Sequence, residues 1–381
     1  MEIKIFFYEP SKRNSSMKII YFITGLKIGG AEAITIDLAN AMSLQGHNIS
    51  IIYLTGANEL SHRILPSVQV IGLNMKKNLR GFIKAQSMAG ILLKKEKPDV
   101  VHGNMFHANM FVRLLRLHSS IKLLITTEHN KFIGENSRMW LYRITDFLSD
   151  INTNVSEEAT GYFLAKRAFS VKKSLTMYNG ICLSNFQRNP IARKLIRQRY
   201  DIEDTSFLFL NVGRLTDAKN QIGLLKAFTT VSEKKPNAKL MILGNGELKD
   251  DLQCFIREYS LEQRVILVSA QLNVADYYNA ADCFVLSSAW EGFGLVLVEA
   301  MACELPVITT DAGGCAEVVK NRDYILPVNN KKLLVERMQM VYDMSLEERK
   351  ALGEENRKLS ERFDMKKIAS QWIELYINKH Y

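Results

Sequence analysis

The 381-residue sequence lacks the patterns that mark secreted, membrane-spanning and zinc-stabilised proteins. Its five cysteines show no C-x-x-C spacing, which argues against a structural zinc site or a disulfide framework and fits a reducing cytoplasm. No apolar run approaches the roughly 20 residues that span a bilayer. The start, "MEIKIFFYEPSKRNSS", has no long apolar segment and no small-residue cleavage site, so we expect no secretion signal.

Acidic residues are scarce in the first half of the sequence. Residues 1–190 hold 24 Lys and Arg against 13 Asp and Glu, whereas residues 191–381 hold 26 against 27. The whole excess behind the net charge of +10 therefore lies in the first half. Such asymmetry predicts an anionic partner for that half, which could be nucleic acid, acidic lipid or a phosphorylated substrate.

Short repeats and low-complexity tracts are also absent, and apolar β-branched runs alternate with helical patterns instead. The alternation runs from "KIIYFIT" to "KLLITTEHN" and starts again from "FLFLNVGR" to "PVITTDA". This predicts an α/β fold with two Rossmann-like, doubly wound parallel sheets. We expect an extension over residues 1–16, domains over residues 17–185 and 186–362, and an amphipathic helix over residues 363–381. Ligands bind such sheets beyond the carboxyl ends of the strands, so motifs that follow strands carry the most weight.

The segment "SSAWEGFGLVLVEAMA" places two carboxylates, Glu291 and Glu299, among glycines and apolar residues after a predicted strand. A helix that begins near residue 294 would point the N–H groups of Gly294, Leu295 and Val296 at a ligand. Two carboxylates beside such a phosphate site suit a sugar nucleotide, because they can accept hydrogen bonds from ribose and sugar hydroxyls. The alternative is a helix with a capping glutamate and one buried ion pair.

The turn "NVGRLTDAKN" places Arg214 and Lys219 after another predicted strand. Two cations there suit a diphosphate, since Arg can bind it bidentately and Lys acts as a point charge. An ordinary solvated loop is the alternative.

Two glycine turns give weaker signals. "ITGLKIGGAE" carries Gly29 and Gly30 before a helix, and "LGNGEL" carries Gly244. Either turn could let backbone N–H groups approach a phosphate or sugar, and either could equally be a packing turn. The first does not have the G-x-G-x-x-G spacing of a nicotinamide site.

Three histidines follow or lie near predicted strand ends in the first half of the sequence. His129 ends the strand-like "LLITTEHN", where it is either structural or placed over a donor sugar. His102 and His107 lack metal-ligand partners at useful spacing, so we interpret them as packing or substrate-shell residues.

Residues 76–97 hold seven basic residues and one acid, with apolar residues at helical spacing. A basic amphipathic helix of this kind can lie on an anionic membrane surface. The alternative is a peripheral helix whose apolar face packs on the sheet.

Together, "GLKIGGAE", "TEHN", "YNGI", "VGRLTDAKN", "LGNGEL" and "EGFGLVLVEAM…PVITTDAGG" resemble the family-4 retaining glycosyltransferases. The resemblance runs from about Met17 to the C-terminus. It implies the GT-B fold, with two domains facing a cleft, the nucleotide sugar held by the second domain and the acceptor by the first. It also implies that the last helix crosses back to the first domain.

By motif match, the resemblance implies that Arg214 and Lys219 bind the diphosphate, Glu291 the donor sugar and Glu299 the ribose. His129 would line the sugar site, and Gly29 and Gly30 would approach the phosphate. A cofactor or metal is not expected beyond the nucleotide sugar, which is more often a UDP-sugar in this family.

The resemblance implies a retaining, metal-independent transfer of a hexose or N-acetylhexosamine to a glycan acceptor, such as a polyprenyl-diphosphate-linked one. Many family members build bacterial lipid-linked oligosaccharides and surface polysaccharides such as lipopolysaccharide. We therefore expect a cytoplasmic enzyme that is peripheral on the inner face of the plasma membrane and binds no nucleic acid. The alternatives are a GT-B sugar-nucleotide epimerase or phosphorylase, or a non-catalytic binder of nucleotide sugars or nucleic acid.

Overall fold

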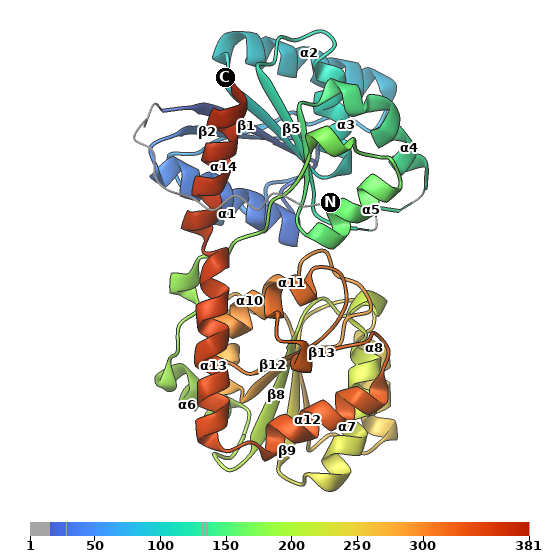
Figure 1. Ribbon diagram of the computed structural model, residues 1–381, viewed down its shortest axis with the longest axis vertical. Coiled ribbons are helices and arrows are strands. Elements are labelled where there is room, and N and C mark those ends of the chain that lie inside the picture. Colours follow the sequence, from blue (N-terminus) through green and yellow to red (C-terminus); the bar gives the residue numbers. More distant parts are fainter. Residues whose placement is uncertain (1–15, 28, 132, 135, 381) are drawn as a thin grey trace. The chain divides into compact units, whose positions relative to one another are not determined.

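The computed structural model describes residues 16–27, 29–131, 133–134 and 136–380, which form two compact units (Figure 1). Unit 1 comprises the chain up to Val155, Thr160–Gly180 and the chain from Met365, and unit 2 comprises Ser156–Ala159 and Ile181–Asp364. The division therefore falls after residues 180 and 364, where the sequence pattern placed it after 185 and 362. Apart from Ser16, the predicted extension lies outside the described residues.

Unit 1 is built on a parallel sheet in the order β3-β2-β1-β4-β5-β6-β7. Both faces are covered: in β1, Ile19, Tyr21 and Ile23 point into one apolar cluster, while Ile20 and Phe22 point into another. The strands are β1 (Lys18–Ile23), β2 (Asn48–Tyr53), β3 (Gln69–Gly72), β4 (Val100–Asn104), β5 (Leu123–Glu128), β6 (Ile151–Asn154) and β7 (Ser174–Thr176).

Two layers of helices cover this sheet. On one face, α1 and α14 pack together, with Ile368, Trp372 and Tyr376 of α14 buried, as the amphipathic spacing predicts. On the other face, α2 and α3 pack on the sheet, and α4 contacts α3. The helices of this part of the chain are α1 (Gly30–Leu44), α2 (Leu79–Glu96), α3 (Phe106–Leu115), α4 (Asn136–Thr145), α5 (Glu157–Ala165) and α14 (Met365–His380).

His102 helps to hold α14 on the sheet. Its Nδ1 lies 2.7 Å from the Tyr376 hydroxyl and its Nε2 lies 2.6 Å from Thr127 Oγ1. The ring also packs against Trp372, and burial lowers the pKa of His102 to about 3. Of the two interpretations of His102, the packing one describes these contacts.

Unit 2 is built on a second parallel sheet, in the order β10-β9-β8-β11-β12-β13. Its strands are β8 (Phe207–Val212), β9 (Ala238–Leu243), β10 (Val265–Val268), β11 (Cys283–Leu286), β12 (Val307–Thr310) and β13 (Ile325–Leu326). Its helices are α6 (Pro190–Arg199), α7 (Gln221–Lys234), α8 (Lys249–Glu258), α9 (Val274–Ala280), α10 (Leu295–Ala302), α11 (Cys315–Val319), α12 (Lys331–Asp343) and α13 (Leu346–Ser360). Among the described helices of both units, none is long and apolar enough to cross a membrane.

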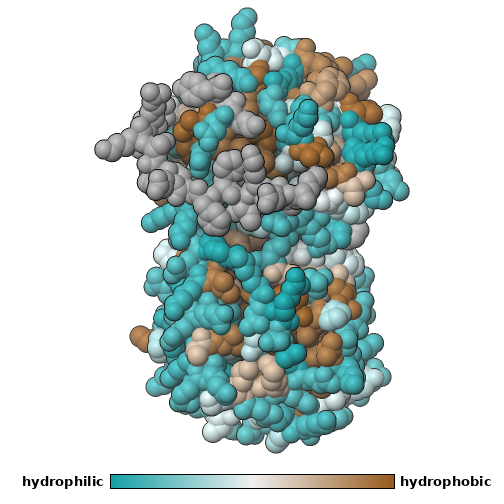
Figure 2. All heavy atoms as spheres, viewed as in Figure 1, coloured by the Kyte–Doolittle hydropathy of each residue, from teal (hydrophilic) through white to brown (hydrophobic). Residues whose placement is uncertain are grey.

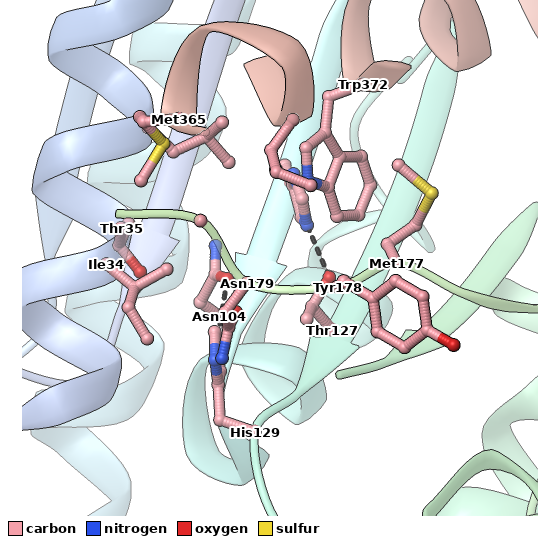
Figure 3. Close-up of a pocket in the computed structure, with 14 residues that line it drawn as sticks. Ile34, Thr35, Asn104, Thr127, His129, Met177, Tyr178, Asn179, Met365 and Trp372 are labelled. Carbon is pink, nitrogen blue, oxygen red and sulfur yellow. Dashed lines mark hydrogen bonds between the residues drawn. The ribbon is translucent and has the colours of Figure 1, made fainter. Parts of the chain in front are cut away.

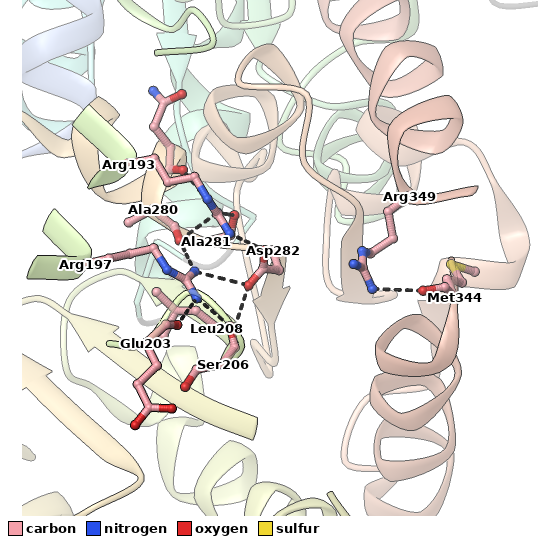
Figure 4. A network of polar contacts seen from close by, with 11 residues as sticks. Arg193, Arg197, Glu203, Ser206, Leu208, Ala280, Ala281, Asp282, Met344 and Arg349 are labelled. Atoms are coloured by element: carbon pink, nitrogen blue, oxygen red, sulfur yellow. Dashed lines mark hydrogen bonds and ion pairs between the residues drawn. The ribbon is translucent and has the colours of Figure 1, made fainter. Parts of the chain in front are cut away.

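A buried ionic network ties α6 to the sheet of unit 2 (Figure 4). The Arg197 side chain is only 2% exposed, and its Nη1 lies 3.3 Å from Asp282 Oδ2. Asp282 also accepts hydrogen bonds from Arg193 Nη2 at 2.7 Å and from the Leu208 N–H at 2.7 Å. The carboxylate of Asp282 therefore joins α6, the start of β8 and the start of β11.

Candidate active site

The catalytic candidates of unit 2 lie on two loops that follow the neighbouring strands β8 and β11. These loops are fastened together: the Ala289 N–H donates to the Ala218 carbonyl at 2.8 Å, and Ser287 Oγ donates to the Lys219 carbonyl at 3.0 Å. The carboxyl ends of adjacent parallel strands thus bring Lys219 and the segment around Glu291 to one place.

Lys219 and Glu291 form an ion pair, with Lys219 Nζ donating to Glu291 Oε1. Their side chains are 19% and 9% exposed, so water screens this pair much less than an exterior one. Ser288 Oγ donates to the same carboxylate oxygen at 2.7 Å. Glu291 therefore orients the ammonium group of Lys219. The alternative interpretation of this segment included one buried ion pair but did not name Lys219 as the partner.

Arg214 contrasts with Lys219 because its side chain remains in solvent. It is 76% exposed, and its Nη2 lies 3.7 Å from the carboxylate of Glu247, whose side chain is 61% exposed. Such a loose pair contributes little to stability. The guanidinium at the end of β8 can therefore turn to an arriving anion without breaking a buried contact.

Gly294 shapes the turn into α10, which begins at Leu295 as the sequence pattern predicts. Gly294 has φ +88°, a left-handed conformation that favours glycine. The N–H groups of Leu295 and Val296 are among those that a helix start leaves without an intrahelical acceptor. Gly313 packs below this turn so closely that a Cβ there would lie 2.0 Å from the Glu291 carbonyl oxygen.

Glu299 lies in the second turn of α10, where it accepts a hydrogen bond from the Tyr278 hydroxyl at 2.8 Å. Tyr278 is fully buried, and burial together with the charge of Glu299 raises the pKa of its phenol well above the usual value. The phenol thus stays protonated and holds the carboxylate. Tyr278 is a residue that the motifs missed.

Gly244 allows two loop segments to touch. A Cβ at this position would lie 1.9 Å from the Gly213 carbonyl oxygen, which follows β8. This contact gives the glycine a packing role, and its contact with a nucleotide stays a prediction.

In unit 1, His129 follows β5 and lies beside Asn104 at the end of β4 (Figure 3). His129 Nε2 is 3.0 Å from Asn104 Oδ1, and burial lowers the pKa of His129 to about 4. The imidazole is therefore neutral at pH 7. Because a carbonyl oxygen can only accept, Nε2 carries the proton and Nδ1 is a hydrogen-bond acceptor. Within the described residues Nδ1 has no partner.

The surroundings of His129 form a small cavity in unit 1. Its polar side is made by Asn104, Thr127 and Asn179, and its apolar side includes Ile34 and Met365 (Figure 3). An unpartnered imidazole nitrogen beside amides and a hydroxyl group suits a hydroxylated ligand. Asn104, like Tyr278, was not singled out from the sequence, although it ends a strand just as His129 follows one.

Gly29 and Gly30 open α1, whose next turn contributes Ile34 to the same cavity. A Cβ at Gly30 would meet no atom within 4 Å, whereas one at Gly29 would lie 2.3 Å from Glu32 Oε2. Burial raises the pKa of Glu32, which makes its charge easier to neutralise. The approach of Gly29 and Gly30 to a phosphate stays a prediction. Ile28, which precedes Gly29 in the motif "ITGLKIGGAE", lies outside the described residues.

Glu128, next to His129, provides a test of the electrostatics of unit 1. It is buried and accepts hydrogen bonds from the hydroxyl of Tyr142 and, at 3.4 Å, from Asn109. Burial raises its pKa from 4.5 to about 7. Because the pKa of Glu128 is raised in the folded state, its contribution to the stability of the fold is complete below about pH 4.5. That contribution is lost as the pH rises through about 7.

We therefore expect Glu128→Gln to gain stability over the natural chain as the pH rises from about 4.5 to about 8, by about 3 kcal/mol in total. Urea unfolding at a series of pH values measures this difference. The exposed Glu59→Gln is the matched control and should show no such trend. A pH-independent difference for Glu128→Gln would contradict the buried, protonatable carboxyl.

Among the described residues, no cluster of three or more His, Cys, Asp or Glu side chains is placed to hold a metal ion. The metal-independent reaction stays a prediction.

Comparison with solved structures defines the fold. The chain matches Anabaena HepE in complex with UDP with a TM-score of 0.82 at 19% identity, covering 95% of this chain and 100% of that one. The two Rossmann-like units are those of the GT-B glycosyltransferases.

Sequence comparison defines the family. The Glycosyltransferase Family 4 model matches residues 28–185, and the Glycosyl transferases group 1 model matches residues 192–359. The chain is a glycosyltransferase of family 4, as the motifs predicted.

Two curated relatives illustrate the family. The 4-alpha-N-acetylgalactosaminyltransferase of Campylobacter jejuni that acts on an N-acetylgalactosamine-N,N'-diacetylbacillosaminyl-diphospho-undecaprenol is 26% identical over 92% of this chain and 97% of its own length. An uncharacterized glycosyltransferase of Methanocaldococcus jannaschii is 35% identical over 47% of this chain, and the match spans only 51% of that relative.

Proposed function

We propose that this glycosyltransferase moves a hexose or N-acetylhexosamine from a UDP-sugar to a lipid-linked glycan, with retention of anomeric configuration and without a metal. The observation that carries the proposal is the Lys219–Glu291 pair beside the start of α10, with Arg214 on the same loop as Lys219. The UDP in the HepE complex and the diphospho-undecaprenol acceptor of the Campylobacter relative support the choice of donor and acceptor.

In the proposed reaction, an acceptor hydroxyl forms a new bond to the anomeric carbon as the bond from that carbon to the diphosphate breaks. The diphosphate oxygen takes the hydroxyl proton on the same face, so a separate protein base is not required. Arg214 and Lys219 stabilise the charge that develops on the diphosphate, which is where fixed cations act most strongly. Neutral His129 accepts a hydrogen bond from a sugar hydroxyl through Nδ1.

Nucleotide sugars can be screened by thermal shift, since a ligand at 100 times its Kd stabilises a protein by about 2.7 kcal/mol. We expect UDP-sugars to stabilise the chain and transfer to survive EDTA. Interconversion of the sugar nucleotide without acceptor would favour an epimerase. Tight duplex binding that weakens steeply with salt would favour a nucleic-acid binder.

Glu299 and Glu291 are expected to differ in what they affect. Glu299→Ala should mainly weaken UDP affinity, because the ribose it holds does not change during the reaction. Tyr278→Phe should weaken affinity in the same direction but less, since it removes only the hydrogen bond that fixes Glu299. Glu291→Ala should mainly slow transfer. Calorimetry with UDP and steady-state kinetics test this, and the reverse pattern would exchange the two roles.

Asn104 is expected to act as a positioning residue for His129. Asn104→Leu removes the acceptor for the Nε2 proton, so kcat/KM should fall about tenfold, the value of one net hydrogen bond. Asn104→Asp keeps an acceptor and should retain more activity. Nitrogen NMR of the His129 ring should show the Nε2-protonated form in the natural chain. An Nδ1-protonated ring, or an unchanged ring in Asn104→Leu, would contradict this role.

The proposal includes peripheral attachment to the inner face of the plasma membrane through α2. The inner side of α2 is buried at Ala89 and Leu93, whereas Leu79, Ile83 and Ile91 are 74%, 58% and 66% exposed. The helix packs on the sheet, as the peripheral-helix interpretation of residues 76–97 describes, and its exposed apolar and basic side chains support the proposed membrane contact. Each Lys or Arg near an anionic surface adds about 1 kcal/mol to binding.

A further inference from the structure

A second exposed apolar surface lies on α4 and the 3₁₀ turn that follows it. Trp140, Ile144 and Phe147 recur at spacings of four and three, so they share one side of this helical segment. They are 59%, 43% and 73% exposed, whereas Met139 and Tyr142 on the other side are 8% and 0% exposed. An ordinary peripheral helix would carry polar residues on its outer side.

Hydrogen bonds join this surface to two neighbouring segments. Arg116, at the end of α3, donates to the Leu148 carbonyl at 3.3 Å, and Lys173 donates to the Ser149 carbonyl at 2.8 Å. Leu117 and Val171, beside these anchors, are 64% and 62% exposed. We call Trp140, Ile144, Phe147, Leu117 and Val171 the α4 ridge. In Figure 2, brown side chains lie among teal ones over the part of unit 1 where Figure 1 draws α3 and α4.

The charges around the α4 ridge are mostly positive. Arg143, Lys166, Arg167 and Lys172 are exposed in the segments that form it or pack beside it. Its acids are engaged by protein groups: Asp150 pairs with Arg116 at 2.6 Å, and Asp146 accepts from Asn152 at 2.6 Å. The outward charge therefore complements anionic lipid headgroups rather than a basic partner.

Helix α2 lies on the other side of α3 from the α4 ridge. Helix α3 contacts α2 on one side and α4 on the other, and Figure 1 shows it between them. Tryptophan and phenylalanine next to Arg and Lys are typical of segments that enter the headgroup region of a bilayer. An anionic membrane matches both features of the α4 ridge, because it offers an apolar interior to the aromatic side chains and negative headgroups to the cations.

We infer that the α4 ridge inserts into the anionic membrane surface, with Trp140 and Phe147 entering the boundary between headgroups and acyl chains. The inference rests on the proposed membrane attachment and names an insertion element separate from α2. In this arrangement α2 supplies long-range attraction through its cations, and the α4 ridge supplies apolar burial that persists at high salt.

Tryptophan fluorescence of the full chain tests this directly. The chain has three tryptophans, of which Trp372 is 4% exposed and Trp290 46% exposed. Trp290→Phe leaves Trp140 as the exposed reporter. With vesicles of phosphatidylcholine and phosphatidylglycerol, its emission should shift to the blue and be quenched by brominated acyl chains. Unchanged, unquenched emission on vesicles that still bind the chain would overturn the inference.

Flotation of variants gives the second readout. Phe147→Ser should lower vesicle partitioning at least about tenfold, because one phenylalanine side chain is then no longer transferred from water into the bilayer. Leu272→Ser, in unit 2, removes a side chain that is 97% exposed and should leave partitioning unchanged. Equal partitioning of these two variants would contradict insertion, and would point to a protein partner for the ridge.

Transfer to a short water-soluble acceptor separates this inference from the proposed function. Phe147→Ser should keep that activity while it loses vesicle binding. An inactive natural chain that still inserts Trp140 would overturn the proposed reaction and leave the insertion element standing.

Discussion

Replacement of Lys219 by alanine is expected to lower kcat by about 10² to 10³, with a smaller effect on the KM for the donor. Removal of one preorganised contact to developing charge costs about 3–4 kcal/mol. Arg214→Ala should also lower kcat by orders of magnitude. Because its side chain is 76% exposed, the free energy of unfolding should change by less than about 0.5 kcal/mol.

Lys219→Ala also leaves the 9% exposed Glu291 without its cation, which could lower stability as well as rate. The double variant Lys219→Ala/Glu291→Gln removes that unpaired charge and should remain slow. Lys234→Ala, at the C-terminal end of the helix α7 that follows Lys219, is the control and should keep the natural rate. Near-natural rates for both Arg214→Ala and Lys219→Ala would rule out the diphosphate assignment.

Asp282→Ala is expected to destabilise unit 2 by about 3–5 kcal/mol, because it leaves the buried Arg197 guanidinium without its counter-ion. Urea unfolding measures the change. Asp343→Ala removes a carboxylate that is 57% exposed and pairs with Lys235, so it should cost less than about 1 kcal/mol. Equal losses for the two variants would mean that burial does not govern the strength of this network.

Strands that are buried on both faces were predictable because their residues are continuously apolar. The four quoted strand runs contain the observed strands β1, β5, β8 and β12. The polar strand β6, "INTN", was missed although all four residues are buried. The side chain of Asn152 is held by groups distant in sequence: it accepts from Arg113 at 2.6 Å and from Thr126 at 2.8 Å. Local hydrophobicity cannot reveal such pairing.

The residues of the candidate site likewise divide into those that the local sequence could predict and those that it could not. Lys219 and Glu291 could be singled out separately, because each follows an apolar strand. Lys219 could not be named as the ion-pair partner of Glu291, since their pairing depends on β8 and β11 being neighbours, which is a property of the sheet order. Tyr278 could not be singled out, because the sequence of its helix, α9, has the pattern of an ordinary buried helix. Asn104 could have been singled out from the sequence, because it is a polar residue at the carboxyl end of a strand, as His129 is.

Retention of configuration is the central claim, and one product analysis tests it most directly. The chain is incubated with an α-linked UDP-sugar that stabilises it and with a polyprenyl-diphosphate-linked sugar acceptor, in the presence of EDTA. UDP should be released only when the acceptor is present, and proton NMR of the product should show an α-linked anomeric signal. A β-linked product would contradict the same-face reaction, and activity that EDTA abolishes and magnesium or manganese restores would contradict the role given to Arg214 and Lys219.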